Sequence, residues 1–218
     1  RIITAMANWQ TIFWLIGILS VISFFIVLKV IPKMLVEPPV SLRVQLSFLK
    51  QPRIISTLGV TFLFFISFSL INTYITPFLF SIRSLSEEEI STILCALGIA
   101  SFIGSKLAGF FADHIGITRT LLGSMSVHFV MLLLLFFVYH SLFLTAIVLF
   151  IWVGASWTFG PTQSYNLVSI APKATGIMLS LNSSFVQLGF AVGAGMGGVT
   201  IAHFPLIAIS FVCAICVL

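Results

Sequence analysis

The chain has 218 residues, of which 60% are hydrophobic and only 7% are charged, and its net charge is +5. Soluble domains carry roughly a quarter charged residues, so this composition excludes a water-soluble globular protein. The sequence also contains no His–Glu metal cluster, no phosphate-binding glycine loop and no nucleophile beside a base. We therefore expect neither an enzyme nor a bound cofactor, and we assign the surplus positive charge to membrane loops rather than to nucleic-acid binding.

Long charge-free runs predict membrane-spanning helices. A hydrocarbon core about 30 Å thick is crossed by about 20 helical residues, and the backbone in lipid must pair within its own segment. Unbroken apolar runs exclude the short alternating strands of an outer-membrane barrel. The runs in chain order are 2–28, 54–82, 90–112 (interrupted by Lys106), 120–172 with a turn near 139–141, and the part after Lys173 with a turn near 203–205. The last two runs each hold two helices, so we predict an all-α membrane protein, truncated at both ends.

Basic residues indicate which ends of these helices face the cytoplasm. The stretch 32–53 contains Lys33, Arg43, Lys50 and Arg53 against the single acid Glu37. Short loops rich in Lys and Arg mark the cytoplasmic side. This rule places Arg119 and Lys173 inside and the acidic run 87–89 outside. Within the same stretch, the apolar residues Leu42, Val44, Leu46 and Leu49 lie among polar and basic side chains, which predicts a short helix on the membrane surface.

Polar residues within the spans predict an internal path. Such residues are costly in lipid and usually face a cavity. They are concentrated in four spans, whereas 120–139 and 205–218 are almost wholly apolar apart from His128, which we interpret as a packed histidine. Four helices should therefore line a substrate cavity and two should face lipid. The candidate cavity residues are Asn72, Tyr74, Lys106, Trp157, Gln163, Asn166, Asn182 and Gln187.

Several of these candidates also have a structural interpretation. Lys106 either binds an anionic substrate or extends its amine to the membrane surface. The four amide side chains either bind substrate or form hydrogen bonds between helices. The two aromatic candidates either stack on a flat substrate or anchor the helix at the membrane interface.

Two stripes of small residues predict close helix packing. Lipid provides no hydrophobic force between helices, so small side chains that allow backbones to approach are typical of helix contacts. One stripe is Ala100, Gly104, Ala108 and Ala112. The other is Gly189, Gly193 and Gly197.

Four sequence motifs carry a resemblance to a known family. The segment Gly109-Phe110-Phe111-Ala112-Asp113-His114-Ile115-Gly116, followed by Arg119, resembles the loop signature G-x-x-x-D-R/K-x-G-R/K-R/K of the major facilitator superfamily. Residues 182–198, with their Asn-Ser-Ser start and glycine cluster, are similar to the eleventh helix of its drug:proton antiporter group. Residues 73–78 are similar to the outer end of the seventh helix, and 8–14 to the turn from helix five into helix six.

This resemblance implies an organisation and a function. Residues 1–31 would be the end of helix five and helix six, 32–53 the cytoplasmic central loop, and 54–218 the C-terminal bundle of helices seven to an incomplete twelve. The partner would be the N-terminal half of the same twelve-helix transporter, in a cell membrane. The implied activity is proton-coupled efflux of a small molecule that resembles a drug, sugar or nucleobase. A uniporter or importer of the same fold, and a non-transporting membrane receptor or enzyme, remain alternatives.

The loop motif is the expected conformational element, with Gly109, Asp113, Gly116 and Arg119 as its residues. A carboxylate facing the positive N-terminal end of a neighbouring helix is stabilised by about 0.3–1 kcal/mol. The resemblance implies that helix five is that neighbour, so that Asp113 would latch the two halves together in the outward-open state. The alternative is a solvated surface carboxylate. His114 departs from the family pattern, which has Arg or Lys at this position.

Overall fold

The computed structural model describes residues 10–30, 47–82, 85–203, 210, 213, 215 and 216. Six helices in these residues are long and apolar enough to cross a membrane. A single turn of 3₁₀ helix, η1 (Pro172–Ala174), precedes the last of them. The six are α2 (Gln10–Val30), α4 (Pro52–Ile82), α5 (Glu87–Ile115), α6 (Ile117–Val138), α7 (Leu142–Ile170) and α8 (Thr175–His203). The prediction of an all-α, multi-pass membrane protein is confirmed.

The helix ends lie close to the charges and turn residues that predicted them. The turn at 139–141 separates α6 from α7, and Lys173 lies in η1 immediately before α8. Three expected features lie wholly or mostly outside the described residues: the helix tail at 1–5, the surface helix at 42–49 (of which 47–49 are described), and most of the span 205–218. The division of the chain at residues 31 and 53 therefore stays a prediction.

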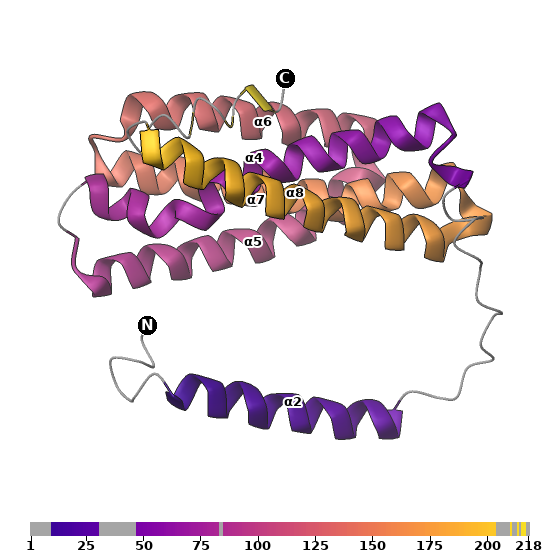
Figure 1. Cartoon of the computed structure of the whole chain (residues 1–218), viewed down its shortest axis with the longest axis horizontal. Coiled ribbons are helices and arrows are strands. Elements are labelled where there is room, and N and C mark those ends of the chain that lie inside the picture. The colour runs from indigo at the N-terminus through magenta and orange to yellow at the C-terminus, as the bar shows by residue number, and fades with distance from the viewer. Residues whose placement is uncertain are drawn as a thin grey trace.

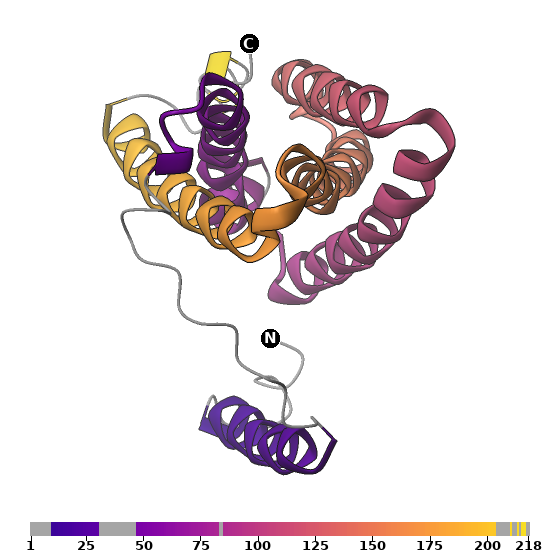
Figure 2. The same ribbon diagram turned by 90° about the vertical axis from the view of Figure 1, so that its right-hand side faces the viewer.

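Five of the helices form a bundle of two groups. α4 packs along α8, and α7 packs against both α5 and α6. Viewed end-on, α7 lies between the α4–α8 pair and the α5–α6 pair (Figure 2). Smaller contacts of α7 with α8 and α4 join the two groups. α2 lies apart from the bundle in Figures 1 and 2, and the hydrophobic side chains from Phe13 to Val30 are exposed along it.

The α4–α8 contact depends on glycines. Gly189, Gly193 and Gly197 are buried, and a Cβ added to any of them would collide with α4. At Gly193 that Cβ would lie 2.5 Å from the carbonyl oxygen of Ile66 and 2.8 Å from Cβ of Ser69. The two backbones are therefore in direct contact, as small residues allow in a membrane.

The α5–α7 contact has the same basis. Ala100, Gly104, Ala108 and Ala112 are the small buried side chains of α5. A Cβ on Gly104 would overlap the carbonyl group of Gly154 in α7. At this close approach the Thr158 hydroxyl donates a 3.0 Å hydrogen bond to the Gly104 carbonyl of the neighbouring helix.

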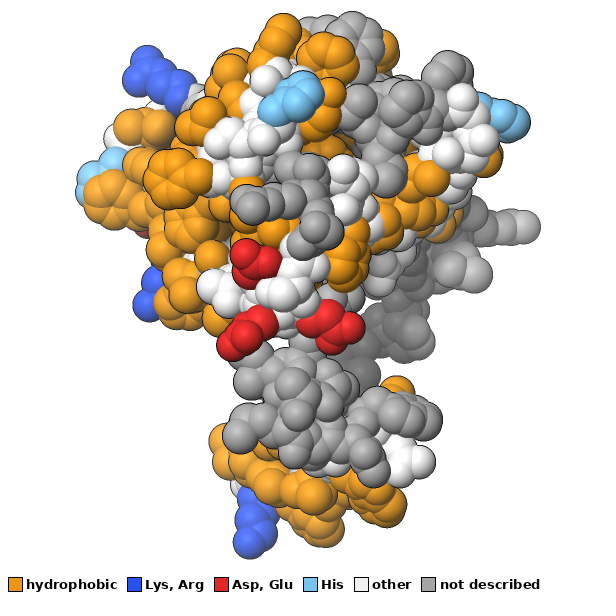
Figure 3. Space-filling model, turned by 90° about the vertical axis from the view of Figure 1, so that its left-hand side faces the viewer, with side chains coloured by type: hydrophobic (Ala, Val, Ile, Leu, Met, Phe, Trp, Pro, Cys, Tyr) orange, Lys and Arg blue, Asp and Glu red, His pale blue; other side chains and the backbone are white. Residues whose placement is uncertain are grey.

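The start of α5 is stabilised by a capping box. The Ser86 hydroxyl accepts from the Glu89 amide at 3.2 Å, and the Ser86 amide donates to the Glu89 carboxylate at 2.8 Å. Glu87, Glu88 and Glu89 occupy the first turn, where the helix dipole favours negative charge. Figure 3 shows this end of the molecule, with acidic side chains gathered on a largely hydrophobic surface.

Candidate functional site

A cavity of about 500 Å³ lies where the two groups of helices meet. Its walls come from α4, α5, α7 and α8, the four helices that contain the polar candidates. The residues that line it are Phe65, Phe68, Ser105, Ser156, Trp157, Gly160, Pro161, Ser164, Asn182, Ser183, Val186, Gln187 and Phe190. The lining is therefore aromatic and uncharged polar, and the volume is in the usual range for a small-molecule site.

Aromatic rings form one wall of the cavity. The ring centroids of Phe65 and Phe190 lie 5.5 Å apart, and those of Phe68 and Phe190 lie 5.8 Å apart at an interplanar angle of 87°. Trp157, across from them on α7, is 48% exposed. Flat aromatic faces with a partly free indole are suited to stacking on a planar apolar group.

Pro161 lies inside α7 at the cavity, and the helix continues through it to Ile170. Proline has no amide hydrogen, so the carbonyl of Trp157, four residues earlier, loses its helical partner. Non-helical or unpaired backbone in a membrane is tolerated mainly where it lines a cavity or is buried in protein. The proline therefore leaves the Trp157 carbonyl as a backbone acceptor without its helical donor, at a residue that lines the cavity.

A buried hydrogen-bond network links three helices next to the cavity. The Gln163 amide donates to the Thr61 hydroxyl at 3.0 Å and to the Thr57 carbonyl at 2.8 Å. Thr61 in turn donates to Oδ1 of Asn182 at 3.1 Å. The Asn182 amide then donates to Ser164 at 3.2 Å. The network therefore joins α4, α7 and α8, and its members Thr61, Gln163 and Asn182 are almost fully buried.

An apolar cluster lies beyond this network, toward the ends of the helices that bear Arg53 and Lys173. Its fully buried members are Ile54, Leu58, Leu167 and Met178. Along α4, α7 and α8 the order from that end is apolar cluster, polar network, cavity. In the described bundle the apolar cluster and the polar network therefore lie between the cavity and the helix ends near Arg53 and Lys173.

His128 forms a second buried polar contact, on the α6 side. Its Nε2 lies 3.0 Å from the Ser67 hydroxyl of α4, and its Nδ1 lies 2.8 Å from the Ser156 hydroxyl of α7. The ring is completely buried and packs 4.5 Å from the Phe64 ring, centroid to centroid. His128 thus cross-links three helices, in accord with its interpretation as a packed histidine.

Three of the predicted cavity residues line the cavity: Trp157, Asn182 and Gln187. Gln163 belongs to the interhelical network, and Asn166 donates to it at 3.4 Å. Asn182 belongs to both, because it bonds across helices and lines the cavity. The interhelical interpretation therefore holds for Asn182 and Gln163, and the substrate-binding interpretation stays a prediction.

The remaining candidates lie elsewhere in the described structure. The Tyr74 hydroxyl donates to the Ala194 carbonyl at 2.9 Å, and its ring packs on Gly197. Asn72 is exposed. Lys106 is also exposed, with its ammonium 4.8 Å from the Phe102 ring centroid, one residue beyond the lining residue Ser105. Their proposed contacts with substrate stay predictions.

Sequence reasoning missed most of the aromatic and small residues of the cavity. Phe65, Phe68 and Phe190 carry no special signal in a chain with 23 phenylalanines. The sequence signal for the cavity was Gly160-Pro161, because a proline within an apolar run marks a helix that lacks one backbone hydrogen bond. In the described part of the chain, no group of three or more His, Cys, Asp or Glu side chains is placed to hold a metal ion.

The loop motif forms a tight connection between α5 and α6. Gly116 is the single residue between them and has φ +91°, a conformation that favours glycine. Its carbonyl accepts from the Thr120 hydroxyl at 2.9 Å. Asp113 and Arg119 are exposed, and a Cβ on Gly109 would meet no atom within 4 Å. His114 stacks on Phe110, with ring centroids 4.1 Å apart.

Comparison with known proteins places this arrangement in a family. The model of the Major Facilitator Superfamily matches residues 1–194. The chain belongs to this superfamily. It is 35% identical over 215 residues to the uncharacterized MFS-type transporter YbcL of Bacillus subtilis (strain 168), covering 99% of this chain and 55% of that protein. It is 29% identical over 187 residues to the inner membrane transport protein YdhP of Escherichia coli (strain K12), covering 86% of this chain and 47% of that protein.

These relatives identify the class of protein. A major facilitator chain with six membrane-length helices in its described residues is a multi-pass membrane protein. The chain spans about half the length of the curated relatives it matches. The activity of a whole transporter, its substrate and its coupling ion are therefore treated as proposals.

Proposed function

We propose that this chain forms the C-terminal half of a transporter that exports a small uncharged molecule in exchange for protons, by alternating access. The observation that carries the proposal is the cavity of about 500 Å³ between α4, α5, α7 and α8. A cavity near the membrane midplane between rocking bundles is the usual location of the substrate site in secondary transporters. We propose that this transporter is located in the cell membrane.

The cavity chemistry supports a class of substrate. Its described lining combines aromatic rings with hydroxyl and amide groups and contains no charged side chain. Such a lining favours a small, partly planar molecule with hydrogen-bonding groups, as in drug-like, nucleobase-like or sugar-like compounds. Gln187 is exposed within this lining, so its amide is free to bond a substrate.

Flux measurements test the proposal directly. The full-length transporter would be reconstituted into vesicles, and the uptake of a hexose, a nucleoside and a planar fluorescent dye measured with and without an imposed pH gradient. We expect flux of at least one probe, stimulated by the gradient. Flux without a gradient effect would favour a uniporter. Gradient-driven flux in the opposite direction would favour an importer, and specific binding without flux a receptor or enzyme.

Substitution in the cavity gives a more specific prediction. Gln187→Ala should raise the half-saturating substrate concentration about two- to tenfold, because a substrate hydrogen bond contributes about 0.5–1.5 kcal/mol. Gln51→Ala is the matched control, since Gln51 is exposed before the start of α4. Equal effects of the two substitutions on the half-saturating concentration would contradict a substrate contact at Gln187.

Substitution of Asp113 tests the proposed latch. Asp113 is exposed at the end of α5, on the part of the loop that the family resemblance assigns to a contact with helix five. Asp113→Asn should shift the transporter toward inward-open by about 0.3–1 kcal/mol, or roughly two- to fivefold in the ratio of the two states. The measurement is labelling of a cysteine placed at Ser183 by an impermeant thiol reagent from each side of the membrane.

The control for this latch is Glu88→Gln, which removes an exposed acid from the opposite end of the same helix. We expect it to leave the labelling ratio unchanged. An Asp113→Asn variant with the labelling ratio and transport rate of the parent would show that this carboxylate is only a solvated surface group.

A further inference from the structure

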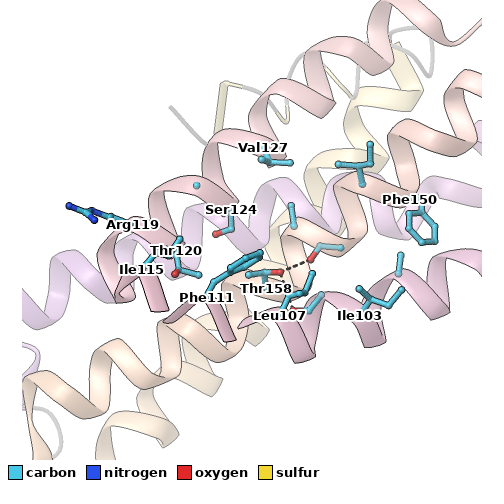
Figure 4. A pocket seen from close by; sticks show the side chains of 16 residues that line it. Ile103, Leu107, Phe111, Ile115, Arg119, Thr120, Ser124, Val127, Phe150 and Thr158 are labelled. Carbon is cyan, nitrogen blue, oxygen red and sulfur yellow. Dashed lines mark hydrogen bonds between the residues drawn. The ribbon is translucent and has the colours of Figure 1, made fainter. Parts of the chain in front are cut away.

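A second hollow of about 450 Å³ lies between α5, α6 and α7, away from the substrate cavity. Figure 4 shows its walls, with Ile103, Leu107 and Phe111 on one side and Thr120 and Val127 on the other. The two hollows share no described lining residue. We call this hollow the α5–α6 groove.

The α5–α6 groove exists because small residues leave space between the helices. Gly123 of α6 faces it, and a Cβ at this position would meet no atom within 4 Å. Hydroxyl groups in its walls are already bonded to backbone carbonyls of the bundle. Ser124 donates to the Leu121 carbonyl at 2.9 Å, and Thr158 donates to the Gly154 carbonyl at 2.9 Å. The surface offered to an occupant is therefore almost purely apolar.

The groove is long enough to hold a lipid acyl chain. Along α5 its lining runs from Ala100 to Ile115, a distance of about 22 Å at 1.5 Å per residue. Half of a hydrocarbon core is about 15 Å. The groove is thus long enough for a lipid acyl chain that runs from the membrane surface to the midplane.

A single cation marks the surface end of the groove. Arg119 is the one charged residue among its described lining, and it lies at the end opposite Phe150 (Figure 4). Arg119 lies in the first turn of α6, three residues after Gly116, so it is at the end of the helix, where headgroups are found. Asp113 lies about 120° around α5 from the groove residue Leu107, so its carboxylate belongs to another face of the helix.

We propose that the α5–α6 groove binds an anionic phospholipid, with one acyl chain between α5 and α6 and the headgroup phosphate on Arg119. The apolar wall holds the chain, and the guanidinium gives the preference for negative charge, since Arg is suited to bidentate phosphate binding. The inference does not depend on the proposed transport activity. The bound lipid would wedge α5 and α6 apart beside the Gly116 turn.

Lipid retention provides the test. The full-length transporter would be reconstituted in vesicles of equal parts phosphatidylglycerol and phosphatidylcholine with identical acyl chains. After extraction in mild detergent, the retained lipids would be counted by native mass spectrometry. We expect preferential retention of phosphatidylglycerol. Arg119→Gln should lower that preference about fivefold, whereas Arg119→Lys should largely keep it.

The acyl-chain contact is tested separately from the headgroup contact. Gly123→Leu fills the groove and should reduce retention of both lipids. Gly195→Leu is the matched control, because its added Cβ also meets nothing within 4 Å but lies on the exposed part of α8. Val127→Trp fills the same groove from further along α6 and serves if Gly123→Leu does not yield folded protein.

Two results would overturn the lipid proposal. One is retention in both groove-filling variants equal to that of the Gly195→Leu control. The other is a phosphatidylglycerol preference that survives Arg119→Gln. Altered dye flux with unchanged lipid retention would assign the groove to a lipophilic substrate instead. Because retention is measured without transport, failure of this proposal and failure of the proposed function are distinguishable.

Discussion

Replacing Gly193 by alanine is expected to lower the stability of the bundle by about 1–3 kcal/mol, because the added methyl group overpacks a tight contact. Its Cβ would lie 2.5 Å from the Ile66 carbonyl oxygen and 2.8 Å from Cβ of Ser69, so α4 and α8 must separate. Separation would also disturb the 2.8 Å hydrogen bond from the Ser69 hydroxyl to the Phe190 carbonyl. The measurement is thermal unfolding of the full-length transporter in detergent, and the readout is the loss of monodisperse protein.

The control for this prediction lies two residues further along the same helix. Gly195→Ala adds the same methyl group where nothing lies within 4 Å. It should be neutral or stabilising by up to about 1 kcal/mol, because alanine favours a helix more than glycine does. If the two variants unfold at the same temperature, the close approach of α4 and α8 does not limit stability.

Replacing Thr61 by valine is expected to lower stability by about 1–2 kcal/mol, although the two side chains have nearly the same shape. Thr61 is fully buried, accepts from Gln163 at 3.0 Å and donates to Asn182 at 3.1 Å. Valine would leave Oδ1 of Asn182 without this donor and would reduce the bonding of the Gln163 amide. Thermal unfolding in detergent measures the effect.

Thr57→Val is the matched control for Thr61→Val. The Thr57 hydroxyl donates to the Arg53 carbonyl one turn earlier, within α4 itself, and is not part of the interhelical network. We expect a change near zero. The double variant Thr61→Val with Asn182→Leu should cost less than the sum of the single changes, since both remove the same bond. Additive losses would argue against coupling between these two residues.

The helices themselves were predictable because charge is rare in this chain. Lys29, Arg53 and Lys173 mark limits of apolar runs, and a charged residue in the middle of a span is costly. The turn at 139–141 was predicted from polar residues between two apolar runs and separates α6 from α7. The capping box at Ser86 gives the start of α5 a local signal of the same kind.

The partners of the side chains were not predictable. Asn182 and Gln187 lie on one helix five residues apart, with similar chemistry, yet Asn182 is buried in a network and Gln187 is exposed in the cavity. His128 was the one polar residue noted in an otherwise apolar span, but its two serine partners come from α4 and α7. These contacts join residues 28 to 121 positions apart, so no local pattern contains them.

The sequence by itself determined three features: that lipid is the solvent, the number of spans up to residue 203, and the stripes of small residues. Each of them depends on charge, length or spacing along one helix. Only the tertiary structure decided that the glycines of α8 face α4, that Phe65, Phe68 and Phe190 wall a cavity, and that α5 and α6 leave a second groove. The physical reason is that lipid and protein interior are equally apolar. The sequence pattern therefore does not distinguish a phenylalanine or leucine that faces lipid from one that faces the protein interior.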